Sequence, residues 1–237
     1  MSFLPQVSLF VALSVCSATA ALAQSPADPS GHWEGTIQAP EMSVPFEVDF
    51  TRNAKGEITG TINLPAERIQ GLPIAKVTID GATVMFHVRA DQPLTGTISS
   101  DGRSITGDMT ASGGAAPFTM TRTGEARIEP PTMNKPVGQP LVGTWRGTIA
   151  TQMGSMQLVL EVANTGDGAT ARLINLDQGS LTIPASTITQ EGTSLTLVFK
   201  SIDGTFAGTL NAAGTELTGT ISQRQGKMPL TFTRDAR

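Results

Sequence analysis

The chain has 237 residues, of which 39% are hydrophobic, 15% charged and 5% aromatic, and it includes 25 glycines and 15 prolines. This composition is typical of a globular, turn-rich protein and differs from that of collagen-like or disordered chains. The formal net charge is -4, and no basic run occurs. The sequence therefore lacks the positive patch that nucleic-acid-binding proteins use, and we expect no nucleic-acid partner.

The first 23 residues have the pattern of a secretory signal peptide. An uncharged run of mainly Leu, Val, Ala, Phe and Ser ends in the small residues Ala21 and Ala23, which form a typical cleavage site. Several Ser and Thr residues dilute the run, whereas a membrane span needs about 20 predominantly apolar residues. We predict a signal-peptide helix, cleavage after Ala23, no membrane span after cleavage, and a periplasmic or secreted protein. Lipid anchoring at Cys16 is the disfavoured alternative.

Cleavage would also remove Cys16, which is the only cysteine of the chain. The mature protein would then have no disulfide, no thiolate nucleophile and no cysteine-ligated zinc. We expect a short disordered segment over residues 24–30 and, after it, domains that are stabilised by packed apolar cores alone.

The rest of the chain contains two copies of one domain. The segment Gly-His-Trp-Glu-Gly-Thr-Ile that begins at Gly31 recurs 112 positions later, from Gly143, as Gly-Thr-Trp-Arg-Gly-Thr-Ile. This period exceeds the roughly 20–50 residues of solenoid units and indicates duplication of a whole domain. We predict copies over residues 31–123 and 142–235, joined by an extended, Pro-rich linker over residues 124–141.

Within each copy, apolar and polar residues alternate with the period of two that is typical of half-buried strands. Turn-forming pairs such as Asp80-Gly81 and Asp203-Gly204 separate these segments, so consecutive strands should pair as antiparallel neighbours. The one helical turn that we expect covers residues 65–68. We predict about eight strands per copy, and in the first copy they cover residues 31–38, 43–52, 57–64, 75–80, 83–89, 94–99, 104–110 and 117–123.

Several glycines fall in register with the inward apolar residues of their strands, where they permit the tight coiling of a small barrel. Closure of the sheet would remove the exposed edges that favour aggregation. The sequence therefore predicts an all-β fold of two tandem antiparallel up-and-down β-barrels, and two β-sandwiches built from the same hairpins are the alternative. The inward glycines are Gly35, Gly60, Gly96, Gly107, Gly147, Gly208 and Gly219.

Strand parity places Trp33 and Arg122 on one face of the first and last strands of copy one, and Trp145 and Arg234 repeat this arrangement. A guanidinium that stacks on an indole gains about 0.5–2 kcal/mol. The first and last strands of a closed meander are neighbours, so each pair should stabilise the closure of its barrel. A Gly-x-Trp on the first strand with an Arg at the end of the last resembles the structural signature of the calycin (lipocalin-like) barrels.

A set of short motifs runs through nearly the whole second copy and includes Gly143-x-Trp145-x-Gly147, Asp177-Gln178-Gly179, Leu217-Thr218-Gly219 and Leu230-Thr231-Phe232-x-Arg234. These motifs resemble those of the small β domain found ahead of the catalytic domain in secreted bacterial α/β-hydrolases. The first copy is similar to a diverged version of this domain. The resemblance implies a duplicated accessory module without a catalytic domain, and it does not imply esterase activity.

The sequence contains no recognisable catalytic motif, because a Gly-x-Ser-x-Gly elbow, Ser-x-x-Lys and His-Glu-x-x-His are all absent. The two histidines, His32 and His87, are expected on outward strand faces, as are Glu34, Glu47 and Asp49. We therefore predict no catalytic residue, no metal and no cofactor, and a protein that is not an enzyme.

Two functions fit these features. In the first, a non-catalytic secreted or periplasmic accessory protein contacts a protein partner through its long connections, at Glu67, Arg68, Asp177 and Gln178, because loops carry function more often than cores. In the alternative, a small apolar ligand occupies a lipocalin-like barrel, although a barrel of this size is more often filled by its own side chains. The candidate pocket lining in the first copy is Trp33, Phe46, Phe86, Met109 and Met120.

Overall fold

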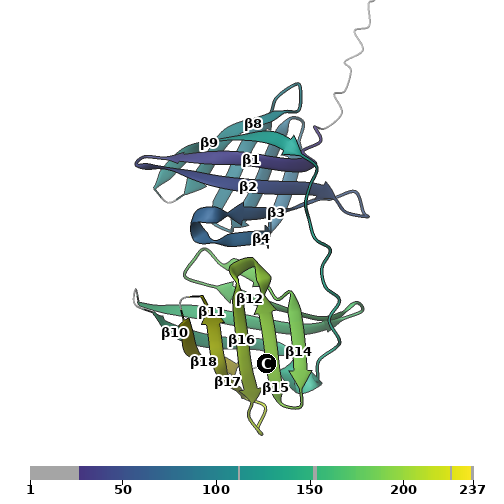
Figure 1. Cartoon of the computed structure of the whole chain (residues 1–237), viewed down its shortest axis with the longest axis vertical. Coiled ribbons are helices and arrows are strands. Elements are labelled where there is room, and N and C mark those ends of the chain that lie inside the picture. Colours follow the sequence, from purple (N-terminus) through teal and green to yellow (C-terminus); the bar gives the residue numbers. More distant parts are fainter. Residues whose placement is uncertain (1–26, 112, 152–153, 225, 236–237) are drawn as a thin grey trace, which may run out of the picture.

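The computed structural model describes residues 27–111, 113–151, 154–224 and 226–235, which form two curled antiparallel sheets of nine strands each (Figure 1). The expected signal peptide over residues 1–23, with Cys16, lies outside the described residues. Within the described part of the chain, no helix has the length and apolar character needed to cross a membrane. The predicted all-β class with two tandem barrel-like units is confirmed.

The first sheet is an antiparallel meander whose order is β4-β3-β2-β1-β9-β8-β7-β6-β5, so the first strand pairs with the last. The chain passes directly from the edge strand β4 to the other edge strand β5. At this corner the N–H groups of Ile74 and Ala75 donate to carbonyls of Gly60 and His87. Its elements are β1 (Gly31–Ala39), β2 (Met42–Arg52), β3 (Ile58–Leu64), the 3-10 helix η1 (Pro65–Glu67), β4 (Ile69–Pro73), β5 (Lys76–Asp80), β6 (Thr83–Arg89), β7 (Gln92–Ile98), β8 (Ser104–Ala111) and β9 (Gly114–Gly124).

The second sheet repeats this topology with the order β13-β12-β11-β10-β18-β17-β16-β15-β14. The two sheets are called barrel 1 and barrel 2 below. The elements of barrel 2 and of the segment before it are η2 (Gln139–Leu141), β10 (Gly143–Thr151), β11 (Gly154–Thr165), β12 (Gly168–Asn175), β13 (Leu181–Pro184), β14 (Thr187–Glu191), β15 (Ser194–Phe199), η3 (Lys200–Ile202), β16 (Gly204–Leu210), β17 (Glu216–Gln223) and β18 (Gly226–Arg234).

The ninth strand of each barrel lies in a segment that the sequence analysis treated as a connection. Strands β4 and β13 bury only two apolar side chains each, Ile69 and Leu72 in the first copy and Leu181 and Ile183 in the second. Strands this short offer too few alternations to reveal the period of two. The expected helical turn is present as η1.

Barrel 1 is filled by its own aromatic side chains. Phe46, Phe86 and Phe118 are each at most 1% exposed, and their rings meet edge to face, with Phe118 at 6.1 Å from Phe46 and 6.3 Å from Phe86 between centroids. Such pairs contribute about 0.5–1.5 kcal/mol each beyond the burial of their area. The interior of this barrel is therefore a packed core.

The segment that precedes each barrel is hydrogen-bonded to it. The indole N–H of Trp33 donates to the carbonyl of Pro29 at 2.7 Å, and the indole N–H of Trp145 donates to that of Leu141 at 3.0 Å. The N–H of Ala27 donates to the carbonyl of Gly81 at 3.0 Å. Residues 27–30, which the sequence analysis assigned to a disordered segment, thus contact barrel 1 directly.

The Pro-rich segment between the barrels is bonded to both of them. In barrel 1, the N–H of Arg127 donates to a carboxylate oxygen of Asp49 at 2.8 Å. In barrel 2, Asn134 accepts the N–H of Ala169 on β12 through its carbonyl and the N–H of Ile188 on β14 through its side chain. The segment therefore bridges two strands near opposite edges of the second sheet.

Candidate functional site

The Trp and Arg residues of each copy lie directly opposite one another on the first and last strands. The guanidinium carbon of Arg122 is 4.8 Å from the ring centroid of Trp33, and that of Arg234 is 4.1 Å from the ring centroid of Trp145. Both indoles are fully buried. These four residues belong to the barrel framework and do not reach a cavity.

The residues that were expected to line a pocket in barrel 1 belong to its core. Phe46, Phe86 and Met120 are buried in the packed core together with Trp33, while Met109 is half-buried against the same core. Their own aromatic contacts fill the space that a ligand would need. In this structure they are therefore core residues.

His32 and Asp49 are buried, contrary to the expectation that both lie on solvated outward faces. His32 is 1% exposed and Asp49 is 4% exposed, and Nδ1 of His32 lies 2.9 Å from Oδ1 of Asp49. The segment after β9 covers this part of the outer face and places the N–H of Arg127 on the same oxygen. His87 is half-buried, and Glu34 stays exposed.

Replacing Asp49 with alanine is expected to lower the unfolding free energy by about 2–3 kcal/mol, because the buried His32 ring and the part-buried N–H of Arg127 would lose their shared partner. Asp49→Asn should cost clearly less, since its amide oxygen can accept both hydrogen bonds. Chemical denaturation of the two variants measures the difference. Equal losses of unfolding free energy for Asp49→Ala and Asp49→Asn would contradict this role of the Asp49 carboxylate.

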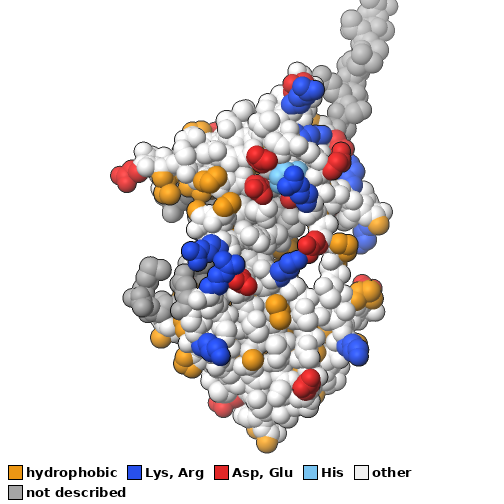
Figure 2. Space-filling model, in the orientation of Figure 1, with side chains coloured by type: hydrophobic (Ala, Val, Ile, Leu, Met, Phe, Trp, Pro, Cys, Tyr) orange, Lys and Arg blue, Asp and Glu red, His pale blue; other side chains and the backbone are white. Residues whose placement is uncertain are grey.

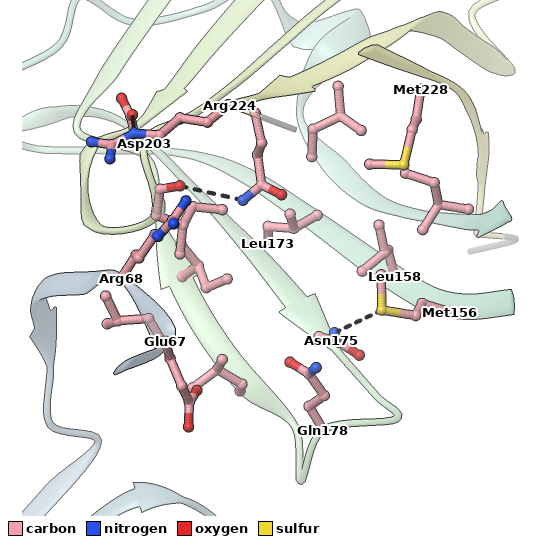
Figure 3. A pocket seen from close by; sticks show the side chains of 17 residues that line it. Glu67, Arg68, Met156, Leu158, Leu173, Asn175, Gln178, Asp203, Arg224 and Met228 are labelled. Carbon is pink, nitrogen blue, oxygen red and sulfur yellow. Dashed lines mark hydrogen bonds and ion pairs between the residues drawn. The ribbon is translucent and has the colours of Figure 1, made fainter. Parts of the chain in front are cut away.

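The candidate contact residues come together at the junction of the two barrels. Glu67, Arg68 and Gln178 line one cavity there, as Figure 3 shows. Asp177 does not line it, because its carboxylate accepts the backbone N–H of Gln157 at 2.6 Å. The long connections of the two copies therefore lie against each other within one chain.

The cavity has a volume of about 310 Å³ and opens at the end of barrel 2 that adjoins barrel 1. Its walls are mainly apolar side chains of barrel 2, and η1 with the residues after it covers one side from barrel 1. The rim is polar. The apolar wall consists of Ile69, Ile149, Met156, Leu158, Leu173, Leu181, Ile183, Ile202, Ile221 and Met228, and the polar residues are Glu67, Arg68, Asn175, Gln178, Asp203, Gln223 and Arg224.

The two copies place their inward rings at different positions. At the offset of 112, Phe46 and Phe118 of barrel 1 correspond to Leu158 and Leu230 of barrel 2, whereas Leu94 and Met120 correspond to Phe206 and Phe232. The rings of barrel 2 meet at Phe206 and Phe232, 5.4 Å apart between centroids, and the smaller Leu158 lines the cavity. Interiors are normally packed without such voids, so the cavity marks the part of barrel 2 that this arrangement of rings leaves unfilled.

Among the described residues, three other than glycine have a left-handed backbone, and all three belong to loops at this junction. They are Arg68, Ser180 and Asp203, with φ of 57°, 54° and 50°. Arg68 and Asp203 line the cavity, and Ser180 directly precedes the lining residue Leu181. Residues in this region cost of order 1–3 kcal/mol each, and they gather at ligand clamps and active sites. Arg68 and Asp203 are also the residues that end η1 and η3, so the same backbone conformation closes a short helix on each side of the cavity.

The charges of the cavity are nearly all paired. Arg89 lies 3.1 Å from the carboxylate of Glu67, and Arg224 forms an ion pair with Asp203. The side chain of Arg68 has no hydrogen bond or ion pair with any described residue.

Among the described residues, two carboxyl groups have a shifted pKa, and Asp28 is one of them. Burial of Asp28 opposes its ionisation, but the hydrogen bonds from Ser30 outweigh this effect and lower the pKa. The other is Asp101, whose pKa is lowered first by the Ser99 hydroxyl, and both lie outside the cavity.

A direct contact holds the two barrels together beside the cavity. The N–H of Ala90, in the turn between β6 and β7, donates to the carbonyl of Gly179 at 3.1 Å. Gly179 has a φ of 59°, which favours glycine, and a Cβ there would require the exposed carboxylate of Asp91 to move. The sequence pattern suggests Glu67, Arg68 and Gln178 as contacts for a partner protein, and it does not indicate that the two connections meet.

The apolar wall in barrel 2 was missed by sequence reasoning. Residues such as Met156, Leu158 and Leu173 look like ordinary core positions of half-buried strands. The signal that could have found them is the difference between the copies, in which leucine replaces phenylalanine at two inward positions. In the described part of the chain, no group of three or more His, Cys, Asp or Glu side chains could hold a metal ion.

No protein-family model and no curated protein matches the chain. Among solved structures, one similar protein is from Bacteroides fragilis and is described provisionally as an outer membrane protein, with 10% identity, a TM-score of 0.27, and coverage of 87% of this chain and 97% of that one. Another, from the DUF3598 family of Nostoc punctiforme, has unknown function, 13% identity, a TM-score of 0.27, and coverage of 87% and 96%. Neither likeness is strong enough to assign a function.

Proposed function

We propose that the protein binds a small apolar ligand in the cavity between barrel 2 and η1, without catalysing a reaction on it. The observation that carries the proposal is the cavity of about 310 Å³ with its mainly apolar wall. Ligand sites are typically concave, mostly apolar and about 300–1,000 Å³ in volume, with a few polar groups that orient the ligand. The cavity has each of these properties.

The lining residues support a binding role more than a catalytic one. The residues that line the cavity include no Ser, Thr, Cys, Lys or His, which are the usual nucleophiles and general bases. Its two acidic side chains, Glu67 and Asp203, both form ion pairs with arginines. A leader peptide over residues 1–23 would place this binding protein in the periplasm or outside the cell.

The accessory role implied by the resemblance to hydrolase β domains is the less favoured function. That role needs Glu67, Arg68, Asp177 and Gln178 to be free for a partner protein. Instead, Glu67 pairs with Arg89, Asp177 bonds to Gln157, and Arg68 and Gln178 line the cavity.

Binding can be measured with N-phenyl-1-naphthylamine, a neutral apolar dye whose fluorescence rises in apolar surroundings. We expect this dye to bind the cavity with a dissociation constant of micromolar order, which corresponds to a binding free energy of about −7 to −8 kcal/mol. Leu158→Phe should weaken binding at least about tenfold, because it places the side chain of barrel 1 at the matching position and fills the cavity. Titration of dye into both proteins provides the comparison.

Ala163→Phe is the matched control, since it adds a similar ring on the exposed face of the same strand β11. It should leave dye binding unchanged. If Leu158→Phe destabilises barrel 2, the double variant Leu158→Phe/Phe232→Met can be used instead. It introduces the two side chains that barrel 1 has at the matching positions, and it leaves the total side-chain volume nearly unchanged. Dye affinity equal to wild type in a folded variant of either kind would refute the cavity as the binding site.

A further inference from the structure

We propose that the ligand is an amphipathic anion, with its apolar chain in the cavity and its anionic head group on Arg68. This inference rests on the proposed function and adds the chemical class of the ligand, a single-chain molecule of the long-chain carboxylate type. It is carried by the charge of Arg68, by the place of Arg68 in the fold, and by the division of the cavity into an apolar and a cationic end.

Arg68 is the unpaired cation of the site. The other charged residues that line the cavity are paired, Glu67 with Arg89 and Asp203 with Arg224. In the adjoining groove, which Arg68 also lines, Lys200 pairs with Glu129, while Glu47 accepts a hydrogen bond from the neutral amide of Asn63 and keeps its charge. Among the Lys and Arg residues that line the cavity and this groove, Arg68 alone has no ion pair with a described residue. A guanidinium offers several donors in a planar fork, which suits a carboxylate or phosphate oxygen pair.

Arg68 adopts a backbone conformation that carries a cost for a residue with a side chain. Its φ of 57° is in the left-handed region, which favours glycine or asparagine over arginine. In barrel 2 the residue at the matching position, directly before the strand β13, is Ser180 with a φ of 54°. The cation is therefore particular to the copy that covers the cavity, and the fold itself does not require it.

The cavity is divided into two chemical ends. Figure 3 shows Arg68 beside Arg224 and Asp203 at one end, whereas Met156, Met228 and Leu158 lie at the other. Lys and Arg side chains also gather at the junction of the barrels on the face that Figure 2 shows. A ligand whose chain contacts the methionine end would thus present its head group to the cationic end, at the opening toward solvent.

The test compares decanoate with 1-decanol, which share a chain length and differ in the head-group charge, as competitors of the dye. At low salt, wild type should bind decanoate at least about fivefold more tightly than decanol, and the ratio should fall as added salt screens the charge. Arg68→Ser introduces the residue that barrel 2 carries at the same left-handed position. It should bring the ratio of decanoate affinity to decanol affinity to about one. Arg172→Ser, which removes the same charge from an exposed position on β12, should keep the wild-type ratio.

The outcomes separate this inference from the proposed function. Dye binding with equal affinity for decanoate and decanol in wild type would overturn the anionic head group and leave the apolar site intact. If Arg68→Ser lowers the affinity for decanoate and for decanol by the same factor, the anionic head group is overturned as well, because the arginine would then act through packing. Failure of wild type to bind the dye, the acid or the alcohol would overturn the proposed function itself.

Discussion

Replacing Gly219 with alanine is expected to destabilise barrel 2 by about 3 kcal/mol, the upper part of the range for overpacked interiors. Gly219 lies directly opposite Gly208 in the pairing of β16 with β17. A Cβ at Gly219 would overlap the carbonyl oxygen of Ala207 and the Cα of Gly208. Both are backbone atoms, so a side chain could be accommodated only if one strand moved.

Thermal unfolding measures this effect. A loss of 3 kcal/mol in a domain of this size corresponds to a fall in melting temperature of roughly 12–24 °C. Gly107→Ala should have the same effect on barrel 1, because a Cβ there would overlap the carbonyl of Thr95 and the Cα of Gly96 in the same way. Gly219→Ala should lower the melting temperature of barrel 2 alone, and Gly107→Ala should lower that of barrel 1 alone.

Gly166→Ala is the control for the loss of glycine flexibility. No atom lies within 4 Å of the position of its Cβ, so stability should change by no more than about 0.5 kcal/mol. A Gly219→Ala variant as stable as Gly166→Ala would show that the two strands are not held at this close distance.

The paired glycines also show why the fold could be predicted from the sequence. Alternation of period two, turn pairs and in-register glycines are local signals, and each one limits how neighbouring strands can pair. The pairing of β1 with β9 and of β10 with β18 then follows from closure of the meander. The expected strands of the first copy lie close to the observed bounds for the same reason.

Contacts between distant segments could not be predicted in this way. His32 has the parity of an outward residue, and it is buried only because the segment around Arg127 crosses that face. The cavity likewise depends on how η1 approaches the end of barrel 2, which no strand pattern encodes. Alternation identifies inward positions, but it does not show whether the side chains that share an interior fill it.

Replacing Arg234 with methionine is expected to destabilise barrel 2 by about 3 kcal/mol, through the loss of charged hydrogen bonds and of the stacking on Trp145. The Arg234 guanidinium donates to the carbonyls of Gly214 and Val142 at 2.9 Å each and also to that of Pro140. It thus joins the last strand to the turn before β17 and to the segment that enters the barrel. Arg234→Lys keeps the charge without the planar fork, so it should recover only part of the loss.

Arg122→Met in barrel 1 provides the matched comparison. Arg122 donates to the carbonyl of Asp28, but its Nε is buried without a partner among the described residues, and its guanidinium lies farther from the indole. We therefore expect a smaller loss, of about 1–2 kcal/mol, confined to the unfolding of barrel 1. Because each arginine joins strands of one barrel only, calorimetry should assign each loss to a separate transition. Equal losses in both barrels from either substitution would mean that the copies unfold as one unit.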